Sequence, residues 1–440
     1  MEICHKRTNF YKDNKLVRKF GAKCVIIGLF NTVKRENLID IMKGYSSMNE
    51  NIESSQKFPM RPVAPLGVIA MNGCEEMGRR VNEYLMNWQV DATSDQKLHS
   101  FYGSDKNGFL LEAHCPRFGT GEGKGMIKDT VRGYDLFIIC DVGAYQCTYK
   151  LYGREVPMTP DEHYADLKRI IAAVSGKAYR INVIMPMLYE GRQHRRTSRE
   201  SMDCAVMLQE LVAMGVSNII TFDAHDPRVQ NAIPLSGFES IMPTYQMLKA
   251  MCHTYDDLRI DKHHMMVISP DEGALNRNIY YSSAMGVDYK RRDYTRVVNG
   301  RNPIVAHEYL GDSVEGKDVF VADDIIASGD SILDLAHNLK RRKAKRVFAG
   351  ATFAFFTSGL EAFDKAYAEG VIDHVFATNL TYTPKEVLER PWFSQADMSK
   401  YMAFVIATLN HDQSLSYLLN PWNRIEKLLT KYRADHPVED

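Results

Sequence analysis

The chain has 440 residues, and 55 Lys and Arg residues balance 55 Asp and Glu residues, so its formal net charge is zero. This length exceeds what one hydrophobic core supports, which predicts two or more domains, and the balanced charge gives no general attraction to nucleic acid or to a membrane surface. The eight cysteines include no C-x-x-C pair, which favours reduced thiols in a cytoplasmic protein without structural zinc.

The first 63 residues differ in composition from the rest of the chain. A basic start and the apolar run Ala22–Phe30 precede the polar stretch SSMNENIESSQKFPMRP, which predicts an N-terminal extension and linker over residues 1–63. The apolar run is too short to span a membrane. Met48 is an alternative start of the protein, and a small ordered extension is the other interpretation.

From Leu66 onward, short apolar runs alternate with amphipathic helical patterns. The apolar runs include LGVIAMN, DLFIICD, RINVIMP, NIITFD, MMVISPD and DVFVADD. This alternation predicts largely parallel sheets covered by helices, and the strands are numerous enough for two α/β units in tandem. Ligands of such sheets bind at the carboxyl ends of the strands. Four runs end there in notable residues: Arg192–Gln193, Asp223 with His225, Asp271, and Asp323–Asp324.

The stretch VFVADDIIASGDS predicts a buried strand over Val319–Ala322 and a strand-to-helix turn over Ala327–Ser331. The free amides and hydroxyls of such a turn suit a phosphate monoester. Asp323 and Asp324 beside it can accept hydrogen bonds from vicinal hydroxyls or hold a divalent cation, a combination that describes a ribose 5-phosphate. The alternative is that the aspartates are solvated loop residues and that Ser328 is a simple N-cap.

Several segments resemble a known family. VADDIIASGDS resembles the Asp-Asp-x-x-Asp-Thr-Gly-Gly-Thr signature shared by type I phosphoribosyltransferases and ribose-phosphate pyrophosphokinases. MPMLYEGRQHRRTSRES with its following TFDAHDP, VISPDEGALNR, and PRFGTGEGKGMIKDTVRGYDLFII are similar to further pyrophosphokinase segments, in that family's order, over roughly residues 64–420. Simple phosphoribosyltransferases lack the first half of this pattern.

The resemblance implies a fold of two tandem phosphoribosyltransferase-like α/β domains with mainly parallel sheets. The implied N-terminal domain covers residues 64–236 and is joined by about 403–420, and the C-terminal domain covers 237–402. Residues 421–440 form a tail beyond the family's usual end. Ile425, Leu428 and Leu429 share one helical face of that tail, which predicts packing on the core or on a partner subunit.

The resemblance also implies a reaction, in which a pyrophosphoryl group passes from ATP to the 1-hydroxyl of ribose 5-phosphate with Mg²⁺, for nucleotide biosynthesis. The implied partners are these two substrates and further copies of the chain, in a dimer-based oligomer such as a hexamer. The implied ribose-phosphate site is Asp323, Asp324, Ser328, Gly329, Asp330 and Ser331. The implied ATP site is Phe118, Glu122, Arg192, Gln193 and His225, with Phe118 and Glu122 given to a neighbouring subunit. The implied metal site is His225, Asp271 and Asp323.

The chain departs from the family pattern at the arm that carries a catalytic lysine and arginine. In an ungapped alignment, Arg296 falls on or beside the arginine position, but Tyr294 falls on the lysine position. Lys290 and Arg292 lie close by and are candidate replacements, while a solvated basic face is the equally weighted alternative. Three smaller departures are Ala327 for an acid, Asp330 for a glycine and His194 for an acid. A non-catalytic regulatory paralogue and a phosphoribosyltransferase therefore remain alternatives.

Overall fold

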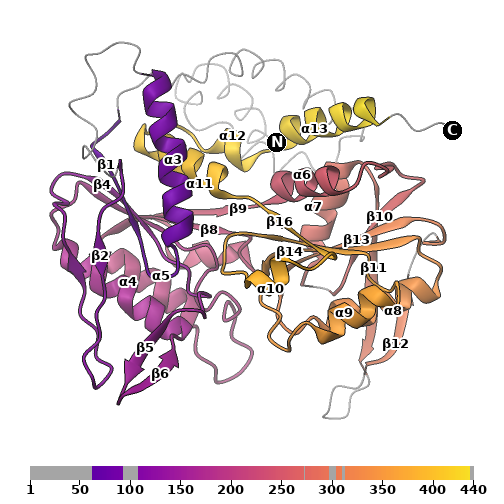
Figure 1. Ribbon diagram of the computed structural model, residues 1–440, viewed down its shortest axis with the longest axis horizontal. Helices are drawn as coiled ribbons and strands as arrows, with labels where there is room; N and C mark the ends of the chain where they lie inside the picture. The colour runs from indigo at the N-terminus through magenta and orange to yellow at the C-terminus, as the bar shows by residue number, and fades with distance from the viewer. Residues whose placement is uncertain (1–61, 93–107, 272, 297–303, 310–312, 437–440) are drawn as a thin grey trace, which may run out of the picture. The chain divides into compact units, whose positions relative to one another are not determined.

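A computed structural model describes residues 62–92, 108–271, 273–296, 304–309 and 313–436 (Figure 1). Nearly all of the expected extension, with the alternative start at Met48, lies outside these described residues. Among the helices of the described part, none combines the length and the apolar character needed to cross a membrane.

The N-terminal domain is built on a five-stranded sheet in the order β1-β4-β7-β8-β9, in which every neighbouring pair is parallel. Its strands are β1 (Leu66–Ala70), β4 (Asp135–Ile139), β7 (Arg180–Ile184), β8 (Val216–Phe222) and β9 (Gly237–Ile241). Two small hairpins pair β2 (Ala113–His114) with β3 (Met126–Ile127), and β5 (Thr148–Leu151) with β6 (Arg154–Pro157). Strand β9 lies just beyond the domain boundary expected at residue 236.

Helices cover both faces of this sheet. They are α3 (Glu75–Ala92), α4 (Pro160–Val174), α5 (Asp203–Ala213) and α11 (Ser399–Asn410), with a 3-10 turn η3 (Pro227–Ala232) after β8. Buried apolar residues of α4 and α5 share one cluster with the sheet. Helix α11 comes from far along the chain and packs beside α3, where Trp88 stacks on Phe404 at a ring-centroid distance of 4.3 Å (Figure 1). The N-terminal sheet is therefore covered by a segment that follows the C-terminal sheet in sequence.

The C-terminal domain is built on a seven-stranded sheet in the order β12-β11-β10-β13-β14-β15-β16. Its strands are β10 (Met265–Ser269), β11 (Asp288–Arg296), β12 (Ile304–Tyr309), β13 (Asp318–Ile326), β14 (Arg346–Ala354), β15 (His374–Thr378) and β16 (Phe393–Ala396). All neighbours are parallel except β11 and β12, which form an antiparallel edge. Helices α8 (Asp330–Arg341), α9 (Glu361–Ala368) and α10 (Lys385–Leu388) contribute to one apolar cluster, on one face.

The opposite face of this sheet is covered by three helices that share a second cluster. They are α6 (Thr244–Thr254), α7 (Leu275–Met285) and the C-terminal α13 (Trp422–Asp435), which follows the short α12 (Ser416–Leu419). In α13, Ile425 and Leu429 are buried and Leu428 is partly buried in this cluster. The face expected for the tail therefore packs on the C-terminal domain of its own chain, against α6 and α7.

Each main sheet carries a buried Asp–Arg pair where two adjacent parallel strands begin. Asp135 and Arg180 are register partners on β4 and β7, and the guanidinium donates to both carboxylate oxygens at 2.8 and 2.7 Å. Asp318 and Arg346 are register partners on β13 and β14, with the corresponding distances of 2.9 and 2.6 Å. The two sheets therefore carry equivalent Asp–Arg pairs at the edge where their strands begin, which indicates that the two domains are built alike.

Candidate active site at the meeting of the two sheets

The strand that carries the paired aspartates is longer than expected. Strand β13 runs to Ile326 rather than ending near Ala322, so Asp323 and Asp324 lie within its carboxyl-terminal part and not in a loop. Asp324 is buried at 6% exposure, whereas Asp323 is partly exposed. The interpretation of the aspartates as solvated loop residues is therefore wrong.

The expected turn leads directly into α8, which begins at Asp330 with Gly329 as its N-cap. Gly329 has φ +89°, and a Cβ there would lie 2.3 Å from the ring of Phe363, so only glycine fits this close approach. Because Gly329 holds the cap position, Ser328 is not the N-cap. Its hydroxyl instead donates to the carboxylate of Asp330 at 2.9 Å. The carboxylate of Asp330 thus accepts a hydrogen bond from within the turn, and Asp330 is exposed to solvent.

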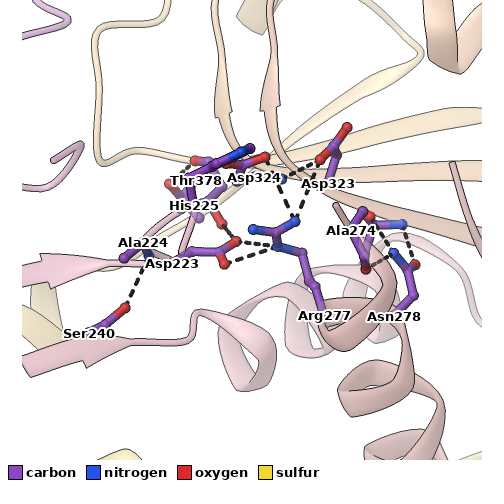
Figure 2. A network of polar contacts seen from close by, with 12 residues as sticks. Asp223, Ala224, His225, Ser240, Ala274, Arg277, Asn278, Asp323, Asp324 and Thr378 are labelled. Carbon is purple, nitrogen blue, oxygen red and sulfur yellow. Dashed lines mark hydrogen bonds and ion pairs between the residues drawn. The ribbon is translucent and has the colours of Figure 1, made fainter. Parts of the chain in front are cut away.

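A network of polar contacts joins the ends of β8 and β13 (Figure 2). Nδ1 of His225, just after β8, donates to Asp324 at 2.7 Å. Arg277 of α7 donates through Nε to both oxygens of Asp223 at 3.0 and 2.9 Å. Its Nη1 lies 3.5 Å from Asp323 and 3.7 Å from Asp324. Residues from the two sheets therefore form one charged cluster.

The end of β8 is itself firmly held. Asp223 has φ +45°, a left-handed backbone conformation that is uncommon for a residue with a side chain. Its buried carboxylate accepts a hydrogen bond from the hydroxyl of Thr352 on β14 at 2.6 Å. The next residue, Ala224, donates its amide to the hydroxyl of Ser240 on β9 at 3.0 Å. A strained backbone with this many fixed contacts is typical of functional sites.

The charged groups of this cluster shift each other's pKa values. Burial, and then repulsion from Asp324, raises the pKa of Asp323 well above its usual range. For Asp324 burial acts in the same direction, but the hydrogen bond from His225 and the charge of Arg277 outweigh it and lower the pKa. The hydrogen bond to Asp324 raises the pKa of His225. The site therefore holds Asp324 as a carboxylate and favours a charged His225.

Two residues of α7 organise this cluster and were missed by sequence reasoning. Asn278 is fully buried, and its side chain accepts from the amide of Ala322 at 3.0 Å and donates to the carbonyl of the same residue at 2.7 Å. It thereby fixes β13 one residue before the aspartates. The sequence did offer one indication. Arg277 lies four residues before Tyr281 and therefore on the buried face of α7, where a charged side chain needs a buried partner of opposite charge.

The other expected site residues converge on the same place. Asp271 follows β10, and its Oδ1 accepts from the amide of Ala274 at 2.9 Å at the start of α7. It lies near enough to Asp323 to contribute to the raised pKa of that carboxyl. Arg192 and Gln193 are exposed in the loop after β7, and the charge of Arg192 acts on His225.

The sequence comparisons agree with this construction. A profile described as the N-terminal domain of ribose phosphate pyrophosphokinase matches residues 66–215, and a phosphoribosyl synthetase-associated domain matches residues 296–420. The ribose-phosphate pyrophosphokinase of Vibrio cholerae is 30% identical over 320 residues, which cover 71% of this chain and 92% of that protein. The chain belongs to the ribose-phosphate pyrophosphokinase family. The Haemophilus influenzae member is 28% identical over 321 residues, with 71% and 92% of the two chains covered.

The fold of this family member is also that of a solved structure. Phosphoribosylpyrophosphate synthetase from Mycobacterium smegmatis superposes with a TM-score of 0.62 at 19% identity, covering 79% of this chain and 99% of that one. The predicted family and the predicted α/β architecture with mainly parallel sheets are thus confirmed.

The segment expected to match the family's arm lies at the antiparallel edge formed by β11 and β12. Lys290 is buried at 6% exposure, in the part of β11 that pairs with Ile268 of β10. Arg292 and Arg296 lie farther along, where β11 pairs with β12, and Tyr294 is the register partner of His307. The side chains of Arg292, Tyr294 and Arg296 lie outside the described residues, so the choice of arm residue stays a prediction.

The two family residues expected to serve a neighbouring subunit lie on a hairpin of the N-terminal domain. Phe118 is 58% exposed, and its amide donates to the carbonyl of Glu122 at 2.8 Å. The hairpin is anchored by Arg117, which donates to both oxygens of the buried Asp166 on α4 at 2.6 and 2.8 Å. A firmly anchored hairpin thus presents an aromatic side chain to solvent.

His194, which replaces an acid of the family pattern, lies beside His225. The ring centroids are 5.3 Å apart, and Nε2 of His194 is 3.6 Å from Asp226. Its Nδ1 donates to the carbonyl of Arg192 at 3.1 Å. The substitution therefore places a second imidazole between the Arg192 loop and the end of β8.

The residues expected to hold a metal are compatible with a cation bound mainly through substrate. Within the described ranges, no group of three or more His, Cys, Asp or Glu side chains forms a complete metal site. The cluster nevertheless gathers three carboxyl groups, those of Asp223, Asp323 and Asp324, around the guanidinium of Arg277. A divalent ion would favour the ionised form of Asp323 and would take its remaining ligands from phosphate oxygens and water.

Proposed function

We propose that this chain transfers a pyrophosphoryl group from ATP to the 1-hydroxyl of ribose 5-phosphate, with release of AMP and phosphoribosyl pyrophosphate for nucleotide biosynthesis. The observation that carries the proposal is the 2.7 Å hydrogen bond between His225 and Asp324. It joins the implied nucleotide side of the site, on the first sheet, to the implied ribose-phosphate side, on the second. A reaction between the two substrates needs such a meeting point.

On the ribose side, the partly exposed carboxyl group of Asp323 is suited to the vicinal hydroxyls, and the amides of the turn at Gly329 are suited to the phosphate. On the nucleotide side, Arg192 and Gln193 are exposed and free to approach a base or phosphate. The planar guanidinium of Arg192 can stack on an adenine ring or pair with phosphate oxygens. Each substrate is thereby supported by a different domain.

The transfer breaks the bond between the α- and β-phosphates as the ribose 1-oxygen attacks the β-phosphorus. Such reactions are promoted mainly by positioning and by neutralisation of charge, so no protein nucleophile is required. When bound, Mg²⁺ supplies positive charge to the phosphate oxygens. The side chains proposed to meet it are Asp271, Asp323 and, in its neutral form, His225 through the ring nitrogen that does not bond Asp324.

We further propose that the active form is an oligomer built from dimers, within the cytoplasm. The exposed Phe118 on its anchored hairpin supports this assembly, because a protruding aromatic ring of this kind suits insertion into the ATP site of a second copy. The six cysteines among the described residues are all free thiols, which suits a reducing compartment.

A non-catalytic paralogue is favoured by one observation, the tyrosine at position 294 where the family arm has lysine. The first experiment therefore measures AMP and phosphoribosyl pyrophosphate formed by purified protein from ATP, ribose 5-phosphate and Mg²⁺. Asp271→Ala should abolish turnover, and Glu369→Ala, an exposed acid at the end of α9, should not. Binding of both substrates without turnover would instead support the paralogue.

The phosphoribosyltransferase alternative is tested in the same protein. A transferase would consume phosphoribosyl pyrophosphate in the presence of a nucleobase and would need no ATP. Formation of a nucleotide from those two compounds, without AMP formation from ATP, would overturn the proposed reaction.

A further inference from the structure

Arg277 connects the two domains at the site. Its guanidinium comes from α7 of the C-terminal domain and binds Asp223, which directly follows β8 of the N-terminal sheet. Both partners are buried, with side-chain exposures of 7% and 4%. The same guanidinium faces Asp323 and Asp324 on β13 at 3.5 and 3.7 Å (Figure 2). One side chain thus contacts the carboxyl ends of a strand from each sheet.

This contact lies between the two proposed substrate sites. His225 lies two residues after Asp223 in the short segment that follows β8, so a shift of Asp223 would also displace His225. The Thr352 hydroxyl adds a second restraint on Asp223, from β14. Both contacts to the Asp223 carboxylate therefore come from the ribose side, whereas the backbone amides of Asp223 and Ala224 bond β9 of their own sheet.

We infer that Arg277 is a positioning residue, which holds the His225 end of β8 and the aspartate end of β13 in the arrangement that brings the two substrates into line for transfer. This inference rests on the proposed function and deepens it. Because Arg277 is itself buried behind the carboxylates, it acts through them rather than by touching substrate. Its loss should therefore lower kcat far more than it weakens either substrate's binding.

The decisive variant is Arg277→Lys, which keeps the charge but loses the fork that spans Asp223 and the β13 aspartates. A misplacement of about 1 Å lowers rates by about 100-fold, so kcat should fall by that order while both KM values change less than about threefold. Thr352→Val is a milder second variant, which should lower kcat in the same direction without removing the charge. It keeps the test available if Arg277→Lys fails to fold.

The matched control is Arg346→Lys. Arg346 forms the corresponding buried pair with Asp318 at the opposite end of β13, with side-chain exposures of 13% and 3%. This variant should lose stability as Arg277→Lys does, as seen in the melting temperature, but should keep kcat within about twofold because it lies outside the site. Equal losses of kcat in the two lysine variants, or an unchanged kcat in Arg277→Lys, would overturn the inference.

Binding measurements keep this test separate from the proposed function. With Mg²⁺ present, the affinity for α,β-methylene-ATP, which cannot undergo the transfer, is measured with and without saturating ribose 5-phosphate. In the wild type the two affinities should differ by about fivefold or more, because the two sides are joined through Arg277. In Arg277→Lys that ratio should decrease at least twofold, while the His225–Asp324 hydrogen bond remains as a second link.

An inactive wild type with intact coupling would refute the proposed reaction alone. Coupling that is absent from the wild type, or unchanged in Arg277→Lys, would refute the positioning role, whether or not the wild type turns over.

Discussion

Asp330 places a negative charge where the proposed site receives a phosphate. Its carboxylate lies in the first turn of α8 and accepts the hydroxyl of Ser328 at 2.9 Å. Two like unit charges about 5 Å apart in water repel by about 0.8 kcal/mol, so a phosphate with nearly two charges is opposed by about 1.5 kcal/mol. That value corresponds to about a tenfold change in affinity. Asp330→Asn should therefore lower the KM for ribose 5-phosphate about tenfold.

The assay is initial rate against ribose 5-phosphate concentration at saturating Mg-ATP and low ionic strength, where charge effects are least screened. Asp334→Asn is the matched control, because it removes one exposed carboxylate from the next turn of the same helix and should leave the KM unchanged. The Asp330 variant should be slightly less stable, since a negative charge favours a helix N-terminus. A KM within twofold of wild type, or an equal shift in both variants, would refute a phosphate site at this turn.

Four other outcomes follow from the site and the core. Asp323→Ala should raise the KM for ribose 5-phosphate or abolish turnover, and wild-type kinetics in that variant would remove the ribose site from the end of β13. Asp324→Asn should lower the pKa of His225, because its hydrogen-bond acceptor loses its charge, and titration of the imidazole by NMR checks the direction. Since the pKa of His225 is raised in the folded protein, its pairing with Asp324 adds fully to the free energy of unfolding at acid pH, and this contribution is lost as pH rises through that pKa. Unfolding experiments should show this loss of stability in the wild type but not in Asp324→Asn. Ile425→Ala should destabilise the protein by about 2–5 kcal/mol and Ile425→Val by about 0.5–1.5, measured by urea unfolding against the exposed Thr430→Ala, and equal midpoints would contradict the packing of α13. The kinetics of Lys290→Ala, Arg292→Ala and Arg296→Ala, compared one at a time, should show which basic residue of the arm acts in the transfer. Full rates in all three variants would refute a role of these residues in the transfer.

The alternation of apolar runs with helical patterns was sufficient to predict the tandem α/β fold, because parallel strands buried on both faces leave a strong signal. Among the strands that escaped this reasoning are β9, with the sequence GFESI, and β16, with FSQA. Both lie at the edge of a sheet, and both mix polar with apolar residues. An edge strand needs fewer apolar side chains, so composition alone identifies it poorly.

The position of the site at the strand ends was predictable, but the way its residues join was not. His225 and Asp324 are 99 positions apart and come from different sheets. A strand pattern gives the end at which a side chain lies, whereas the facing of two sheets depends on packing between domains. The partners of Arg277 were likewise not predictable without the packing of the two sheets, because a single arginine in an apolar stripe shows only that it has some buried partner.

The construction of the site argues against a protein that has lost its chemistry. Gathering the buried Asp223 and Asp324 and the partly exposed Asp323 around one guanidinium costs desolvation free energy, and the left-handed Asp223 adds backbone strain at the same point. Apolar residues of similar size would pack there at lower cost, as buried charge clusters are often replaced without loss of stability. A purely structural role would be served by pairs such as Asp135 with Arg180, which are matched in charge. The cluster at the meeting of the sheets, in which the pKa of Asp323 is raised well above its usual range, is better explained by a cationic ligand and a phosphorylated substrate that complete it.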